Sequence, residues 1–165
     1  MRILLAIDGS DFSKPAIQAV TARGFHEDTE VRVLQVVKVP SLLGLGSMGG
    51  YDVALAKSWD EETEQAHVLV AKTAEVLRSY GIKVSTSVEH GNFESTIINA
   101  SEEWKADLIV LGAHGRKGLR RLWMGGVPAA VAFHARCSVE IVRVAPGRER
   151  LTPTTDLEPV WMSNS

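Results

Sequence analysis

Glycine and basic residues are concentrated in one stretch of the chain, a composition that is typical of an anion-binding loop. These residues fall within 112–126 and are Gly112, Gly115, Gly118, Gly125, Gly126, His114, Arg116, Lys117, Arg120 and Arg121. Glycine lets a backbone approach a ligand closely and adopt positive φ. A helix that begins just beyond such a loop offers free N–H groups and a partial positive charge. We therefore interpret the stretch as a site for phosphate.

The segments on either side of this loop have the patterns of a buried strand and of a helix. Residues 107–111 end in a short continuous apolar run, which is typical of a strand buried on both faces of a parallel sheet. Val127 opens a helical pattern that continues to about residue 136. The chain has no G-x-x-x-x-G-K-[ST] motif, and its glycines instead follow G-x2-G-x9-G at Gly112, Gly115 and Gly125.

Strand and helix patterns alternate along the whole chain. Apolar runs predict strands at 3–7, 31–39, 82–88, 107–111 and 139–144. This alternation predicts a three-layer α/β/α fold with a mostly parallel sheet. The third run alternates with polar residues, which indicates a less buried strand at an edge. Ligands of such sheets lie beyond the carboxyl ends of the strands, where the strand order reverses.

Capping residues mark where the helices should begin. Ser13 and Asn92 are expected to cap the first and third helices. Ser58 and Glu61 form a capping box that predicts the start of the second helix, so residues 41–57 are expected to be irregular.

A literal G-x-G-x-x-G occurs at Gly44, Gly46 and Gly49. We do not interpret it as a dinucleotide site, because that motif should lead directly from a strand into a helix, whereas Pro40 and further residues come between them here.

Composition favours one cytoplasmic domain. The chain has 165 residues, a formal net charge of −2 and a single cysteine. This balance gives no general attraction to nucleic acid or membrane, and one cysteine fits a reducing compartment. We expect a domain at 1–145 and, where prolines accumulate, a C-terminal tail at 146–165. The histidines lack metal-site spacing, and Cys137 is expected to be a small buried hydrophobe.

Three blocks of sequence, one of which includes the first two glycines of the pattern, extend along the chain. They are I-L-L-A-I-D-G-S at 3–10, A-D-L-I-V-L-G-A-H-G-R at 106–116 and C-S-V-E-I-V-R at 137–143. Together they resemble the universal stress protein (UspA-like) family over about residues 1–144. The resemblance implies a Rossmann-like, adenine nucleotide alpha hydrolase-like sheet with strand order 3-2-1-4-5. The strand order would then reverse between the strands that end near Asp8 and Gly112.

The resemblance also implies a ligand and the residues that bind it. Nucleotide-binding members of the family carry G-x2-G-x9-G-[ST] and bind ATP, which Mg²⁺ would accompany. Carried over to this chain, adenine would lie near Val36 and Val37, and ribose near Asp8 and Gly112. The phosphates would lie over Gly115, Gly125, Gly126 and Val127, beside His114 and Arg116.

This chain departs from that pattern at two positions. Gly126 stands where a serine or threonine is expected, and Pro128 removes an N–H group near the helix start. The main alternative is therefore a nucleotide-free dimeric scaffold that acts through partner proteins. A slow ATPase is the second alternative, but no residue is placed as a general base and efficient catalysis is not expected.

The resemblance further implies a homodimer formed through the fifth strand. Val139 and Ile141 fall on one face of this strand, which would otherwise be an open edge. The tail is expected to add to this contact. The function predicted from the sequence is that of an ATP-binding protein of the stress response.

Overall fold

The computed structural model describes residues 1–10, 13–23, 28–39, 51–113 and 126–143, with only the backbone described for 51–56. The strands are β1 (Arg2–Ile7), β2 (Glu30–Val37), β3 (Lys83–His90), β4 (Leu108–Gly112) and β5 (Ser138–Val142). The helices are α1 (Ser13–Thr21), α2 (Tyr51–Ser79), α3 (Phe93–Glu103) and α4 (Val127–His134). Strands and helices alternate through the described residues, as the sequence predicts.

The strands form one five-stranded sheet in the order β3-β2-β1-β4-β5. Every neighbouring pair is parallel, and Ile3 of β1 lies opposite both Val31 of β2 and Leu108 of β4. The predicted fold class and strand order are confirmed. β3 lies at one edge and has no fully buried residue, which confirms the interpretation of its alternating pattern.

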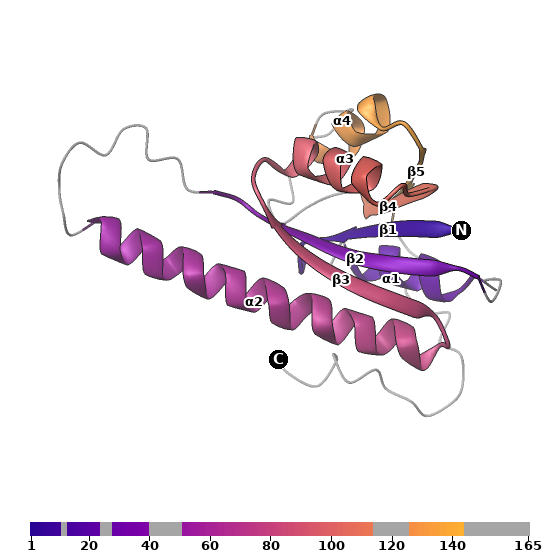
Figure 1. Cartoon of the computed structure of the whole chain (residues 1–165), viewed down its shortest axis with the longest axis horizontal. Coiled ribbons are helices and arrows are strands. Elements are labelled where there is room, and N and C mark those ends of the chain that lie inside the picture. The colour runs from indigo at the N-terminus through magenta and orange to yellow at the C-terminus, as the bar shows by residue number, and fades with distance from the viewer. Residues whose placement is uncertain (11–12, 24–27, 40–50, 114–125, 144–165) are drawn as a thin grey trace.

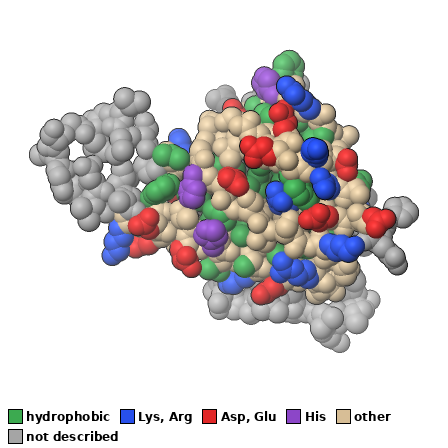
Figure 2. Space-filling model, viewed as in Figure 1, with side chains coloured by type: hydrophobic (Ala, Val, Ile, Leu, Met, Phe, Trp, Pro, Cys, Tyr) green, Lys and Arg blue, Asp and Glu red, His purple; other side chains and the backbone are tan. Residues whose placement is uncertain are grey.

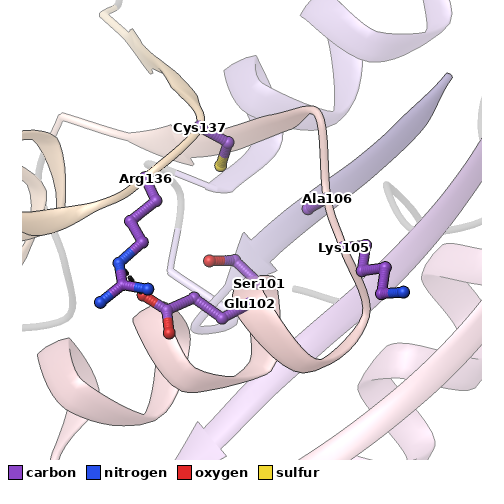
Figure 3. Close-up of a pocket in the computed structure, with 6 residues that line it drawn as sticks. All are labelled: Ser101, Glu102, Lys105, Ala106, Arg136 and Cys137. Carbon is purple, nitrogen blue, oxygen red and sulfur yellow. Dashed lines mark ion pairs between the residues drawn. The ribbon is translucent and has the colours of Figure 1, made fainter.

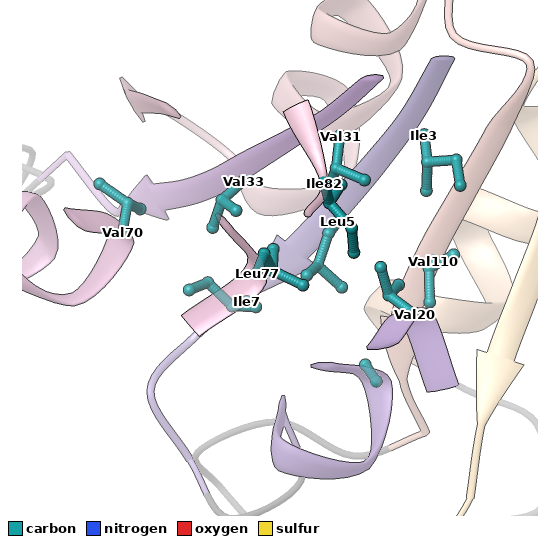
Figure 4. Packing of buried hydrophobic residues seen from close by; sticks show 11 residues of the cluster. Ile3, Leu5, Ile7, Val20, Val31, Val33, Val70, Leu77, Ile82 and Val110 are labelled. Atoms are coloured by element: carbon teal, nitrogen blue, oxygen red, sulfur yellow. The ribbon is translucent and has the colours of Figure 1, made fainter. Parts of the chain in front are cut away.

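Helices cover both faces of the sheet, as Figure 1 shows. One face packs against α1 and α2 through a cluster that includes Leu5, Val20, Val33 and Leu77 (Figure 4). The opposite face packs against α3 and α4 through a second cluster. β1 is buried on both faces because its side chains enter the two clusters alternately.

The start of α3 follows the predicted capping pattern. The side-chain oxygen of Asn92 accepts hydrogen bonds from the backbone N–H groups of Glu94 at 3.0 Å and Ser95 at 3.2 Å. These bonds satisfy two donors that the first turn of a helix leaves without a partner. The prediction for Asn92 is confirmed.

The predicted start of α2 is wrong. The helix begins at Tyr51, so Ser58 and Glu61 lie inside it and do not cap it. Its 29 residues extend about 43 Å, whereas the eight residues of β3 extend only about 26 Å. The beginning of α2 therefore projects past the sheet, as Figure 1 shows. Ala54, Leu55 and Ala56 are strong helix formers that carry the helix through the weaker local capping signal.

Among the residues that the structure describes, no helix is both long enough and apolar enough to cross a membrane.

Candidate functional site

The strand order reverses between β1 and β4, the neighbouring strands in the middle of the sheet. Asp8 directly follows β1, and Gly112 is the last residue of β4. Ile7 lies opposite Gln35 of β2, so the next step along the two strands brings Asp8 to the level of Val36. Three of the predicted site segments therefore meet at the carboxyl edge of the sheet, where parallel α/β sheets bind their ligands.

The Asp8 carboxylate is held in place by the turn that follows it. Its Oδ1 atom accepts hydrogen bonds from the Ser10 N–H at 3.0 Å, the Ser10 hydroxyl at 2.7 Å and the Ser13 hydroxyl at 2.6 Å. The Asp8 N–H in turn donates to the Ser13 hydroxyl oxygen at 3.0 Å. Asp8 is thus a fixed, partly buried carboxylate at the edge of the sheet.

Ser13 has a different role from the one that the sequence predicts. Its hydroxyl bonds to Asp8, and Ser13 is itself the first residue of α1 and not its cap. The contribution of Ser10 and Ser13 to the site was missed. The spacing D-x-S contains a signal for it, because aspartate often accepts a hydrogen bond from the backbone two residues later.

Val36 and Val37 end β2, and their side chains lie in the core with 8% and 1% of their surface exposed. Only their backbone is therefore placed to meet a ligand. The carbonyl of Val37 accepts from the Gly91 N–H at 3.0 Å, on the side of β3. Backbone groups of successive residues point to opposite sides of a strand, so the N–H and carbonyl of Val36 point toward β1. The pairing of β1 with β2 ends at Gln35, one residue earlier, so these two groups lie just beyond the paired part of the strands.

Gly112 and Ala113 mark where the chain leaves the sheet. The Ala113 N–H donates to the Val142 carbonyl at 2.8 Å, which continues the pairing with β5 by one residue. The next predicted site residues, His114, Gly115, Arg116 and Gly125, lie outside the described residues, so their predicted roles stay predictions.

Gly126 is the N-cap of α4, and its backbone has φ 118° and ψ −176°. Residues with a side chain rarely adopt this conformation, which explains a glycine here independently of any ligand. Val127 and Pro128 form the first turn. Helix geometry leaves the N–H groups of Gly126, Val127 and Ala129 without an acceptor inside α4, whereas Pro128 has no N–H.

These observations agree with the comparison of the whole chain with known families. The model of the universal stress protein family matches residues 1–143. The chain belongs to the universal stress protein family. This match ends one residue after β5, so residues 144–165 lie outside the part that the family model covers.

One relative supports the assignment, and two solved structures share the fold. A universal stress protein of Methanocaldococcus jannaschii is 33% identical over 142 residues, which cover 86% of this chain and 81% of the relative. The solved structure of the universal stress protein UspA from Lactobacillus plantarum has a TM-score of 0.73 and 24% identity, covering 87% and 97% of the two chains. An Arabidopsis thaliana family member solved with bound AMP has a TM-score of 0.61 and 16% identity, covering 94% and 99%.

The described part of this universal stress protein contains no group of three or more His, Cys, Asp or Glu side chains that could hold a metal ion. At the carboxyl edge it offers one fixed carboxylate, backbone groups and a helix N-terminus. This arrangement suits the binding of an anion that also carries hydroxyl groups. The N–H groups at the start of α4 can donate to the anionic part, and the Asp8 carboxylate can accept hydrogen bonds from the hydroxyl groups.

Proposed function

We propose that this universal stress protein binds an adenine nucleotide, ATP with Mg²⁺, at the carboxyl edge between β1 and β4, and acts in the stress response as a homodimer. The observation that carries the proposal is the meeting of Asp8, Val36 and Gly112 at the point where the strand order reverses. α4 follows β4 as a crossover helix, so its N-terminus belongs to the same edge.

The base would be recognised by the end of β2. The Val36 backbone faces β1 beyond the last paired residue, so its carbonyl oxygen can accept a hydrogen bond from the 6-amino group of adenine. Guanine carries an oxygen at that position, and two acceptors would then face each other. Discrimination on this basis is about tenfold or more, because an unpaired buried polar group costs about 1–3 kcal/mol.

The sugar and the phosphates would lie toward β4 and α4. The Asp8 carboxylate, fixed by Ser10 and Ser13, would accept hydrogen bonds from the ribose hydroxyls. The N–H groups at the start of α4 would donate to the phosphates, whose charge the helix dipole stabilises. By family resemblance His114, Gly115, Arg116 and Gly125 would complete the phosphate site, with Mg²⁺ bound to the phosphates.

The Arabidopsis relative with bound AMP supports the choice of an adenine nucleotide. Gly126 and Pro128 favour the competing proposal of a nucleotide-free scaffold, since the first lacks a hydroxyl and the second lacks an N–H for phosphate. Each lost donor to a charged group weakens binding by about 1.5–3 kcal/mol. The proposal of phosphate binding rests on the N–H groups of Gly126, Val127 and Ala129, which the start of α4 leaves free to donate to an anion.

The decisive experiment is calorimetry on the full chain with Mg²⁺-ATP, Mg²⁺-GTP, ADP, AMP and cAMP. We expect a micromolar Kd for ATP and binding of GTP that is at least tenfold weaker. Asp8→Asn keeps the Oδ1 acceptor of the turn but removes the charge, so the fold should persist while ATP binding weakens several-fold. Equal affinity for ATP and GTP would contradict the role of Val36, and no binding of any nucleotide would favour the scaffold.

A slow ATPase remains the second alternative, and it is tested on the same samples. Phosphate release at saturating ATP would be measured for the unaltered chain and for Asp8→Asn. We expect no release above background, because no described side chain at this edge is placed as a general base for water. Release that Asp8→Asn abolishes would establish hydrolysis at this site.

The dimer would form through β5, which lies at an edge of the sheet. The backbone carbonyl of Val142 points toward β4, because it accepts a hydrogen bond from the Ala113 N–H. Backbone groups of successive residues point to opposite sides of a strand, so those of Val139 and Ile141 point away from β4 toward the open edge. No described strand pairs with this edge. An antiparallel β5 from a second copy would satisfy these groups across a two-fold axis.

A further inference from the structure

A pocket of about 380 Å³ opens at the end of the sheet opposite the proposed nucleotide site. It is lined by Ser101, Glu102, Lys105, Ala106, Arg136 and Cys137. Figure 3 shows that these residues come from the end of α3, from the turn that leads to β4 and from the approach to β5. Glu102 and Arg136 form an ion pair of 3.2 Å across it.

One large apolar side chain of α4 is uncovered a few residues before the pocket residue Arg136 in the sequence. α4 reads V-P-A-A-V-A-F-H, yet only Val131 among its residues is fully buried. Phe133 has 86% of its surface exposed and lies three residues before Arg136. Figure 2 shows that hydrophobic side chains reach the surface on the face viewed, including the end of the molecule where Figure 1 places α4. No described residue covers the Phe133 ring, apart from an edge contact with His134.

The sequence beyond the family match offers one apolar group that fits this uncovered side chain. Residues 144–165 follow β5, and Val160, Trp161 and Met162 form their largest apolar cluster. Residues 144–160 reach up to about 58 Å when extended, whereas β5 is only about 17 Å long. The tail is therefore long enough to return along the length of β5 and to bring Trp161 to the pocket, which lies beside the first residue of β5.

We propose that Trp161 of the C-terminal tail docks in this pocket against Phe133 of the same chain. An indole buries about 150–250 Å² and pairs favourably with another aromatic ring. Asp156 and Glu158 precede Trp161, and Lys105 makes no ion pair among the described residues, so one carboxylate of the tail meets this ammonium group.

The single cysteine provides a direct test, because Cys137 lines the pocket. Burial raises the pKa of the Cys137 thiol, so its alkylation by iodoacetamide is measured over a range of alkaline pH, and each rate is divided by the thiolate fraction that the same titration gives for that variant. Docked Trp161 shields the thiol. If about nine tenths of the molecules are docked, losing the contact raises the alkylation rate about tenfold.

Four variants of the full chain distinguish the outcomes. Trp161→Ala and Phe133→Ala should each accelerate alkylation about tenfold. The matched controls are Leu151→Ala, elsewhere in the tail, and Tyr80→Ala, another aromatic residue with 63% of its surface exposed. Neither control should change the rate.

An unchanged rate in Trp161→Ala would overturn the proposal. An equal acceleration by Leu151→Ala would overturn Trp161 as the anchor. Protection of the unaltered chain that disappears on dilution would show that the tail of a second copy fills the pocket, which contradicts docking within one chain.

Discussion

Gly126 shows that a backbone conformation can determine which residue stands at a proposed ligand site. The family pattern has a serine or threonine at this position, whose hydroxyl would reach a phosphate. In this protein the backbone at Gly126 has φ 118°, which a residue with a Cβ adopts only with strain. A serine or threonine at this position would supply the hydroxyl, but its Cβ atom would not fit the present backbone conformation without strain.

We predict that Gly126→Ser lowers the free energy of unfolding by about 1–3 kcal/mol, because the new side chain forces a strained conformation or moves the start of α4. Urea denaturation measures this change. Gly126→Ala is the matched control, and it should lose as much stability since the strain comes from the Cβ atom. Unchanged stability in both variants would show that this conformation is not required.

At the same scale, sequence reasoning placed Asp8 at the end of the first strand but missed the groups that hold its carboxylate. Its position after the first strand follows from the apolar run and the turn residues. Its bonds to Ser10 and Ser13 depend on the exact path of the turn, and the capping preference of serine favoured a different role. Gly126 likewise stands out in the sequence, but its positive φ cannot be read from residue type alone.

The ends of the helices show which local signals are reliable. Asn92 caps α3 as predicted. Its side-chain oxygen accepts hydrogen bonds from N–H groups of the first turn, an interaction that needs only neighbouring residues and no distant part of the chain. The capping box at Ser58 was misleading, because α2 gains more from continuing through strong helix formers. The end of α3 had no signal, since the usual glycine is absent there.

At that end of α3, Lys105 occupies the position where helices commonly place glycine. The N–H of Lys105 donates to Glu102 and that of Ala106 to Ser101, and Lys105 has φ 55°. These bonds close the last turn, but a residue with a side chain pays conformational strain for this geometry.

We predict that Lys105→Gly raises the free energy of unfolding by up to about 1 kcal/mol, since glycine adopts positive φ without steric cost. Denaturant midpoints measure the gain. Lys105→Ala is the matched control, because it also removes the ammonium group and its proposed contact with the tail but keeps the Cβ atom, so it should bring no gain. Equal stabilisation by alanine and glycine would assign the effect to the charge.

For the whole molecule, the sheet was predictable because hydrophobic periodicity and the parallel βαβ pattern restrict the possible arrangements. The strand order itself came from the family resemblance. The pocket beside Cys137 could not be predicted, because it depends on how the end of α3 packs against the approach to β5.

The proposed dimer is also tested at this scale. We predict that Ile141→Pro converts the dimer to monomers in sedimentation velocity experiments, because proline removes an N–H that faces away from β4. Ile141→Ala keeps this N–H and should dimerise more weakly without dissociating fully. A monomeric unaltered chain would contradict the dimer, and a dimeric Ile141→Pro variant would place the interface elsewhere.

The central position of β1 has a consequence for synthesis of the chain. β1 is made first, and β2 can pair with one side of it soon afterwards. Its other side waits for β4, about 70 residues after β2. At about 5–20 residues per second, this delay lasts roughly 4–14 s. During that time the nascent chain exposes an unpaired hydrophobic strand edge, which is the kind of surface that chaperones bind.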